Sequence, residues 1–403
     1  MPQTRRPRLK PCLRAVAVIA ILLAGVEVGF RVHDSWQRDE SNPFDREFEL
    51  TMPCWAVHHR MKPLKAQKHL HPDTHQPILW RTNSYGLRGP DVVIPKPADV
   101  YRVVCLGDES VFAGEVSEAD TFCRQLEVAL QDVTRQKVEV INAGVPGYCP
   151  LLSYLQLRQT LLTFQPDLLI LNFDMTDVAD DHHYRRHTRM AEDGTPMGCP
   201  NSEFELHNPE MDHTGPQRFM AVRWLKTQLE WLTDSRRQAE DTIDINSPQG
   251  CYAWLRDEPP DWSVYIDQAF SPIEFMATVA RQINADFVVT AVPTPWQISE
   301  SASTGPGVRQ SVDVPQNAVY LSSRPLELLG NYCQERNILF HNSVPEFRSH
   351  AEADALFLTN SRGLSELGHK FYAMQLQGYL RHRLTHAFTT RPAPHYTTPA
   401  TVQ

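Results

Sequence analysis

The sequence predicts an α/β layer fold with a central parallel sheet, because short apolar runs alternate with helical patterns. Five continuous apolar runs are bounded by turn residues, and they cover residues 101–106, 138–142, 167–173, 286–292 and 338–341. Runs of this length without polar alternation suit parallel strands that are covered on both faces. Helical patterns lie between or after them at residues 121–133, 151–163, 272–284, 325–336 and 365–384. Strand and helix in alternation are the signature of an α/β layer fold.

Length and composition fit one large domain, or a domain that carries an insertion. The chain has 403 residues, of which 41% are hydrophobic and 22% are charged, so it can bury a substantial core. The formal net charge is -9, which leaves no basic face of the kind that nucleic acid requires. We therefore expect no nucleic-acid partner, and we expect no cofactor.

The first 33 residues have the layout of a signal or a membrane anchor. Basic residues at positions 5, 6, 8, 10 and 14 precede the apolar run Ala15–Val26, and Glu27 ends that run. The run is short for a membrane span unless Glu27 lies at the interface, and no clear Ala-x-Ala cleavage site follows it. We expect an inner-membrane anchor with its basic end inside, so that the remaining chain faces the periplasm or the cell exterior. Cleavage of the segment would instead give a secreted protein.

Three further regions follow this segment. Residues 34–98 are rich in Pro, His and polar residues with little periodicity, which predicts an extension and linker. Residues 99–384 form the predicted α/β domain, with an insertion at about 183–271 that we place over the carboxyl edge of the sheet. A helix is expected near residues 221–232 of this insertion. Residues 385–403 have the composition of a disordered tail.

Histidine, acidic and cysteine side chains do not form a recognisable metal motif. The acidic and histidine-rich run between Asp177 and His187 matches no ligand spacing, and neither do the histidines of the extension, at positions 58, 59, 69, 71 and 75. Both groups are interpreted as surface loops, and no metal is predicted. No CxxC pair occurs, and a bridge between Cys199 and Cys251 stays open, because sequence does not determine disulfide pairing.

Five blocks of the chain occur in the order of a known family. They are TNSYGLRG at 82–89, Leu106-Gly107-Asp108, VINAGVPGY at 140–148, Pro166-Asp167-Leu168 with Asp177, and LSELGH at 364–369. With these blocks the chain resembles the SGNH/GDSL hydrolases, in their membrane-anchored bacterial subset. The resemblance implies a flavodoxin-like three-layer α/β/α fold with a central parallel sheet. It also implies ester hydrolysis by a Ser-His-Asp set, with an oxyanion hole of backbone N–H groups, a Gly and an Asn side chain.

The block at Asp108 departs from the family at the nucleophile. An ungapped match places Glu109 where the family has its serine, and a carboxylate there would repel a developing oxyanion. A second alignment treats Glu109 as an extra residue, so that Ser110 becomes the nucleophile and Gly114 keeps the family's Ser-x-x-x-Gly spacing. We favour the ungapped match, since an added residue in a tight turn would swing the side chain away. Ser110 is then interpreted as a helix N-cap.

The other blocks lose further site residues. Gly147 lies where the resemblance implies the oxyanion-hole glycine, but Thr176 stands at the position of the Asn. The catalytic base maps to Gly363 and its orienting acid to Asn360, and neither residue type does that chemistry. His369 belongs to the start of the last helix and is interpreted as a packed side chain, although it would be the base if the chain is active.

The joint loss of four site residues predicts a non-catalytic binding module for an acylated glycan, a lipid or a protein partner. The alternative is a carboxyl-ester hydrolase, an esterase or deacetylase, in which Ser110 acts with His369 or an insertion histidine. An acid and base pair among Asp108, Glu109 and Asp174 is the least favoured hypothesis. A Ser110 hydroxyl without an imidazole in reach would contradict the simple esterase.

Overall fold

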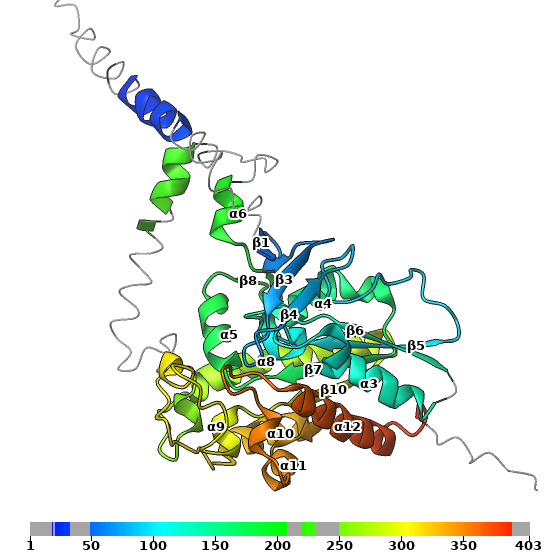
Figure 1. The fold of residues 1–403 in the computed structure, drawn as a ribbon. Coiled ribbons are helices and arrows are strands. Elements are labelled where there is room, and N and C mark those ends of the chain that lie inside the picture. The colour runs from blue at the N-terminus through cyan, green and yellow to red at the C-terminus, as the bar shows by residue number, and fades with distance from the viewer. Residues whose placement is uncertain are drawn as a thin grey trace, which may run out of the picture.

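The computed structural model describes residues 18, 21–32, 49–134, 136–207, 216, 219–226, 228–229 and 250–388. Within them, five parallel strands form one sheet in the order β11-β10-β7-β5-β6 (Figure 1). The strands are β5 (Val100–Leu106), β6 (Lys137–Asn142), β7 (Leu168–Phe173), β10 (Asp286–Ala291) and β11 (Leu339–Asn342). The first of them in the chain lies between the second and the third, which is the flavodoxin-like order. The predicted fold class and its five strands are confirmed.

Helices cover both faces of the sheet (Figure 1). α3 (Phe122–Gln131) and α12 (Glu366–Arg383) pack against each other on one face, whereas α4 (Pro150–Gln159), α5 (Asp177–Arg185) and α8 (Ser263–Gln282) pack together on the other. α10 (Arg324–Glu335) contacts the edge strand β11. All five helices predicted for the α/β domain are present. α8 starts nine residues earlier than predicted, at Ser263, so that Pro272, the first residue of the predicted helix, lies inside it.

Short helices connect these elements. They are α2 (Glu109–Phe112), α9 (Pro295–Ile298), α11 (Val344–Ser349) and the 3₁₀ helices Glu118–Asp120, Leu161–Phe164, Ala253–Leu255, Gln310–Val312 and Asp354–Leu356.

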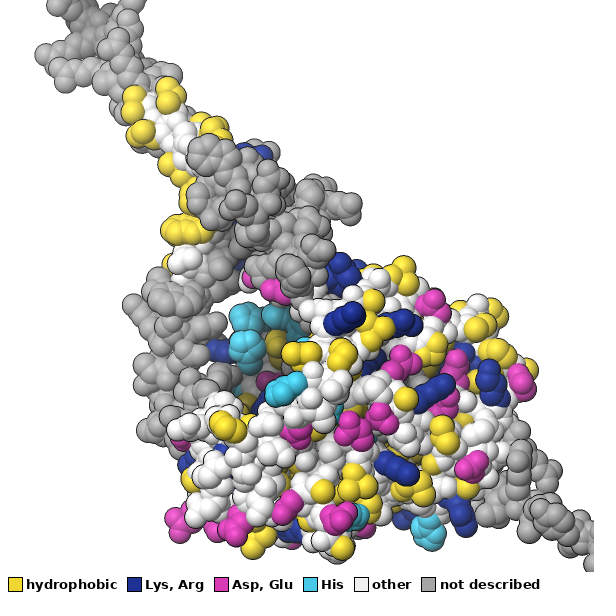
Figure 2. Space-filling view, in the orientation of Figure 1, with side chains coloured by type: hydrophobic (Ala, Val, Ile, Leu, Met, Phe, Trp, Pro, Cys, Tyr) yellow, Lys and Arg dark blue, Asp and Glu magenta, His cyan; other side chains and the backbone are white. Residues whose placement is uncertain are grey.

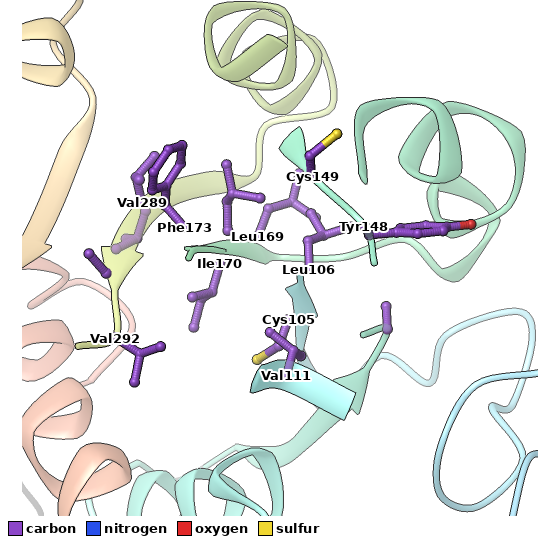
Figure 3. Packing of buried hydrophobic residues seen from close by; sticks show 14 of the residues in the cluster. Cys105, Leu106, Val111, Tyr148, Cys149, Leu169, Ile170, Phe173, Val289 and Val292 are labelled. Carbon is purple, nitrogen blue, oxygen red and sulfur yellow. The ribbon is translucent and has the colours of Figure 1, made fainter. Parts of the chain in front are cut away.

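The core fills the space on both sides of the sheet. In Figure 3, Leu169 and Ile170 point to opposite sides of β7, as successive residues of a strand do, and both are fully buried. Phe173 lies on the Leu169 side, and Cys105 of β5 lies on the Ile170 side. Every residue of β5 and β7 is buried, which explains why their sequences are apolar apart from Arg102 and Asn172.

The described part of the extension, residues 49–98, wraps the domain as ordered structure. It forms two hairpins, β1 (Thr51–Cys54) with β2 (His58–Met61) and β3 (Ala66–Leu70) with β4 (Pro77–Arg81). Contacts with the domain hold them, since strands this short with one partner each are marginal alone. The Asp73 carboxylate, for example, accepts the backbone N–H groups of Thr359 and Asn360 at 2.8 and 2.7 Å.

The lead-in block at residues 82–89 supports the chain that follows β5. Its Arg88 is 4% exposed, and the guanidinium donates hydrogen bonds to the carbonyl groups of Phe112, Ala113 and Val116. One guanidinium thus donates to three buried backbone acceptors. The lead-in therefore positions the turn that carries Glu109 and Ser110.

Parts of the insertion and both termini lie outside the described residues. Of the insertion, β8 (Arg189–Met190) pairs with β9 (Pro196–Gly198), α6 spans Ser202–His207, and residues 220–226 and 228–229 of the expected helix are helical. Residues 21–32 are helical as well, and no helix among the described residues is long and apolar enough to span a membrane. The basic cluster of the predicted anchor and most of the predicted tail are not described. Among the described cysteines none forms a disulfide, which includes Cys199 and Cys251.

Candidate functional site

A cleft of about 250 Å³ opens at the carboxyl ends of β5 and β7. The chain order of the sheet reverses between these two strands, and open parallel sheets bind ligands at such a point. The turn after β5 contributes Glu109 and Ser110, the turn after β7 contributes Asp174, and the loop before α12 contributes Arg362 and Gly363. The apolar part of the wall includes Trp80, Phe112, Val292 and Leu364.

The Ser110 side chain is tied to the core beneath the cleft. Its hydroxyl donates to Asp108 Oδ1 at 2.6 Å and accepts from Asn172 Nδ2 at 2.6 Å. Asn172 is oriented by Tyr372, whose hydroxyl donates to Asn172 Oδ1 at 2.6 Å. Asp108, which accepts the Ser110 N–H at 2.9 Å, is the N-cap of α2, so the prediction that Ser110 is the N-cap is wrong. None of the described hydrogen-bond partners of Ser110 is an imidazole.

Glu109 lies at the mouth of the cleft, where its side chain is 47% exposed. Oε2 accepts the backbone N–H of Gly147 at 3.0 Å, and Oε1 accepts from Arg362 Nη2 at 3.3 Å. Gly147 has a φ of 75°, a left-handed conformation that favours glycine. The N–H group that the resemblance assigns to an oxyanion hole is therefore bonded to a carboxylate of the chain itself.

The block around Gly144 holds α2 in place. Asn142 Nδ2 donates to Val111 O at 2.7 Å. A Cβ on Gly144 would lie 2.3 Å from Phe112 N, so a side chain at this position would push α2 away. Gly144 thus sets the close approach of the two turns that bring Gly147 to Glu109.

Thr176 is turned away from the cleft. The residue is 9% exposed, and its hydroxyl lies 2.8 Å from Asp174 Oδ1 and 3.1 Å from Asp180 Oδ2. Its single hydroxyl proton is directed at these carboxyls. Thr176 is consequently not a donor to the cleft in this conformation.

A carboxyl group fills the space beside Gly363. A Cβ on Gly363 would lie 1.8 Å from Glu115 Oε2, so no side chain fits there unless Glu115 moves. Ser361 donates its hydroxyl to Glu115 Oε1. Burial raises the pKa of Glu115 against the opposing effects of Ser361 and Arg362. The position that the resemblance assigns to the catalytic base is thus taken by an acid from the turn after α2.

Asn360 lies apart from these residues. It is exposed, its backbone N–H is bonded to Asp73 in the β3–β4 hairpin, and it does not line the cleft. The position that the resemblance assigns to the orienting acid therefore anchors the extension.

His369 lines the cleft as a neutral, packed side chain. It is 3% exposed, and its ring stacks on Phe122 with centroids 6.4 Å apart. Its Nδ1 atom has no hydrogen-bond partner. Burial, and to a smaller extent Arg88, lowers the pKa of His369 to about 3. Ser110 is bonded to Asp108 and Asn172 instead, so Ser110 and His369 do not form a nucleophile and base pair.

Several buried carboxyl groups lie behind the mouth of the cleft. Burial, and next the charge of Glu109, raises the pKa values of Asp108, Asp174 and Asp180, that of Asp180 to about 8. Burial thus disfavours the charged forms of all three acids. No group of His, Cys, Asp and Glu side chains in the described parts of the chain is arranged to hold a metal ion.

Parts of the two groups interpreted as surface loops are packed, whereas His69, His75, His183 and His187 are exposed. The run between Asp177 and His187 consists mainly of α5, in which Asp177 and Asp181 are buried and Asp181 pairs with Arg185 at 2.6 Å. Helical periodicity is hard to recognise in this run because its buried face includes acids.

The extension histidines also correct the surface-loop interpretation. His58 and His59 lie on β2 with their Nδ1 atoms 3.0 Å apart, and His59 Nε2 contacts Pro146 O at 2.9 Å. Burial, and next the charges of neighbouring histidines, lowers the pKa of His58 to about 3. His71 is buried too. Figure 2 shows histidines gathered on the part of the surface where β1 and α5 lie.

Sequence reasoning missed the residues that complete the cleft. Arg362 and Glu115 belong to no motif, and Trp80 comes from the extension that was interpreted as a linker. Arg362 directly precedes Gly363, and this adjacency was the feature of the sequence that could have placed Arg362 at the cleft. Nothing in the sequence placed Glu115 beside the last block.

No family model and no curated protein matches the sequence. Solved structures do match it. A lipolytic protein of the G-D-S-L family from Desulfitobacterium hafniense is 12% identical, with a TM-score of 0.36 over 69% of this chain and 99% of that chain. The lipase/acylhydrolase from Enterococcus faecalis is 12% identical, with a TM-score of 0.37 over 73% and 100%. An acetylxylan esterase from Geobacillus stearothermophilus is 10% identical, with a TM-score of 0.36 over 70% and 94%.

The chain has the flavodoxin-like fold that the motifs suggested. Residues of two of the sequence blocks line the cleft, namely Pro146 of the block at 140–148, and Leu364 and His369 of the last block. The likeness to the solved structures concerns the fold, and what those proteins act on is said of them alone.

Proposed function

We propose that this SGNH-hydrolase-like chain is a non-catalytic binding module whose cleft holds an acylated glycan, a lipid or a protein partner. The observation that carries the proposal is that two acids occupy the positions of the oxyanion hole and of the catalytic base. Glu109 takes up the Gly147 N–H, and Glu115 fills the space beside Gly363. The preference for an acylated ligand comes from the family resemblance of the sequence blocks.

These two acids oppose ester hydrolysis for electrostatic reasons. Acyl transfer needs a free donor for the oxyanion and a base within reach of the nucleophile. Here the donor is already bonded to a carboxylate, and a second negative oxygen beside Glu109 would be repelled. The described residues place no side chain at Gly363 to take the proton of an attacking hydroxyl.

A carboxyl-ester hydrolase is the second candidate, because Ser110 lines the cleft and its hydroxyl contacts a carboxyl group. Burial raises the pKa of Asp108 and so disfavours the carboxylate that would accept a proton from Ser110.

Labelling with a fluorophosphonate serine-hydrolase probe separates the two candidates. The full chain and its Ser110→Ala variant are incubated with the probe and with short-chain esters, and Ser117→Ala, an exposed serine outside the cleft, is the matched control. We expect no labelling and no turnover from any of the three, each verified as folded by circular dichroism. Labelling that is lost in Ser110→Ala and kept in Ser117→Ala would establish the esterase.

We also propose that the N-terminal segment holds the protein in the inner membrane, with the domain in the periplasm or at the cell exterior. The basic cluster before an apolar run supports this placement. Membrane fractionation with protease treatment of intact spheroplasts tests it. A protein that stays protected from the protease would contradict an outward-facing domain.

A further inference from the structure

Resting on the proposed binding function, we propose that the cleft recognises a carboxylate, held by the Gly147 N–H and the Arg362 guanidinium, and that Glu109 occupies this receptor when no ligand is bound. In the structure the two donors meet on one carboxylate, with Gly147 N at 3.0 Å from Oε2 and Arg362 Nη2 at 3.3 Å from Oε1 of Glu109. Glu109 therefore shows how a carboxylate is received there.

Both donors are held in position before any ligand arrives. Arg362 Nη1 donates to the Tyr252 hydroxyl at 3.0 Å, which leaves Nη2 directed at Glu109. Gly147 is placed by the turn that Gly144 and Asn142 pack against α2. A guanidinium and a backbone N–H that converge in this way match the two oxygens of a carboxylate.

The Arg362 guanidinium of the receptor keeps its positive charge, and the acidic groups around it favour this charge. The phenol of Tyr252, followed by the carboxyls of Glu109 and Asp174, raises the pKa of Arg362 against burial, so the guanidinium stays protonated. Burial raises the pKa of Asp174, which disfavours the charged form of this neighbour. Glu109 is thus the side chain that hydrogen-bonds and ion-pairs with Arg362 here.

Glu109 can be exchanged at low cost. Its side chain is 47% exposed and that of Arg362 is 38% exposed, and an ion pair this open to water contributes little to stability. The Glu109 side chain can rotate into solvent, and the carboxylate of a ligand can then accept the same two hydrogen bonds from Gly147 and Arg362. Because Glu109 occupies the receptor in part of the molecules, a ligand binds with an apparent affinity that is reduced in proportion to the fraction of molecules in which Glu109 has left.

The surroundings favour a carboxylate attached to a body with an apolar face. Trp80, Phe112, Val292 and Leu364 line the same cleft. A sugar acid can place a ring face on such a wall, and a short acyl acid can place its chain there. The shared chemistry is the carboxylate, and the probes below separate the two sources.

Calorimetric titration of the full chain tests the proposal with glucuronate as the sugar acid, butyrate as the acyl acid, and glucose and butyramide as neutral controls. We expect Glu109→Ala to bind one of the acids about fivefold more tightly than the unaltered chain, since removal of an exposed competing pair is worth at most about that factor. Glu109→Ala combined with Arg362→Gln should lose the binding, and the neutral controls should not bind. Arg124→Ala, which removes an exposed arginine elsewhere, should change nothing.

Equal or weaker acid binding by Glu109→Ala, or binding that survives Arg362→Gln, would overturn the proposal. If Arg362→Gln does not fold, Arg362→Lys replaces it, because it keeps the charge and loses the second arm of the fork. It should still weaken binding, and unchanged binding would count against the proposal. These results are distinct from those of the probe labelling, which reports on catalysis whether or not a carboxylate binds.

Discussion

Glu115 Oε2 lies 1.8 Å from the point that a Cβ on Gly363 would occupy. The two residues share one corner of the cleft, and Ser361 holds the Glu115 carboxyl there. The glycine at the position that the resemblance assigns to the catalytic base therefore leaves the space that the Glu115 carboxyl fills.

Gly363→Ala should lower the free energy of unfolding by about 1–3 kcal/mol, because the new methyl group must displace the Glu115 carboxyl. Gly378→Ala in α12 is the matched control, since nothing lies within 4 Å of its Cβ position, and it should be neutral or stabilise by up to about 1 kcal/mol. Urea unfolding measures both. Equal stabilities of Gly363→Ala and the unaltered chain would mean that Glu115 moves freely.

Arg88→Lys should destabilise the protein by about 2–4 kcal/mol, because an ammonium group cannot replace a fork that serves three buried carbonyls. Arg124→Lys, whose side chain is 45% exposed, should stay within about 0.5 kcal/mol. The comparison is made by urea unfolding at one pH. An equal loss of stability in Arg88→Lys and Arg124→Lys would show that the turn after β5 does not depend on the guanidinium of Arg88.

His369→Phe should flatten the loss of stability in acid. The pKa of His369 is about 3 in the folded chain against an ordinary value of 6.5, so its stabilising contribution is present above pH 6.5 and is lost as the pH falls toward 3. The slope is at most about 1.4 kcal/mol per pH unit. Urea unfolding at pH 6.5 and 5 measures it, with the exposed His382→Phe as control. A variant that keeps the slope of the unaltered chain would show that His369 does not cause it.

Asp180→Asn should act in the opposite direction. The folded pKa of Asp180 is about 8, raised from 3.8, so its stabilising contribution is present below pH 3.8 and is lost as the pH rises through 8. The stability of the variant relative to the unaltered chain should therefore increase by more than about 1 kcal/mol from pH 5 to pH 9. Exposed Asp267→Asn is the control. A constant difference across this range would show that Asp180 is ionised in the fold.

Much of the fold follows from local sequence. A strand buried on both faces is mostly apolar, so β5 and β7 could be predicted from their apolar runs although each contains one buried polar residue, Arg102 or Asn172. The hairpins of the extension could not be predicted, because they are held by contacts such as Asp73 with Thr359 and Asn360, which the local pattern does not contain. The buried acids of α5 likewise concealed a helix, since they contradict the usual apolar face.

Local sequence was enough to predict the five strands of the sheet, the helices α3, α4, α8, α10 and α12, and the loss of a base at Gly363. The side chains that occupy the cleft in its place could be identified only from the folded chain. Glu115 and Ser361 are 246 positions apart and meet because β5 and the loop before α12 end at the same edge of the sheet. Local propensity acts between near neighbours, whereas a cleft is made by parts of the chain that folding brings together.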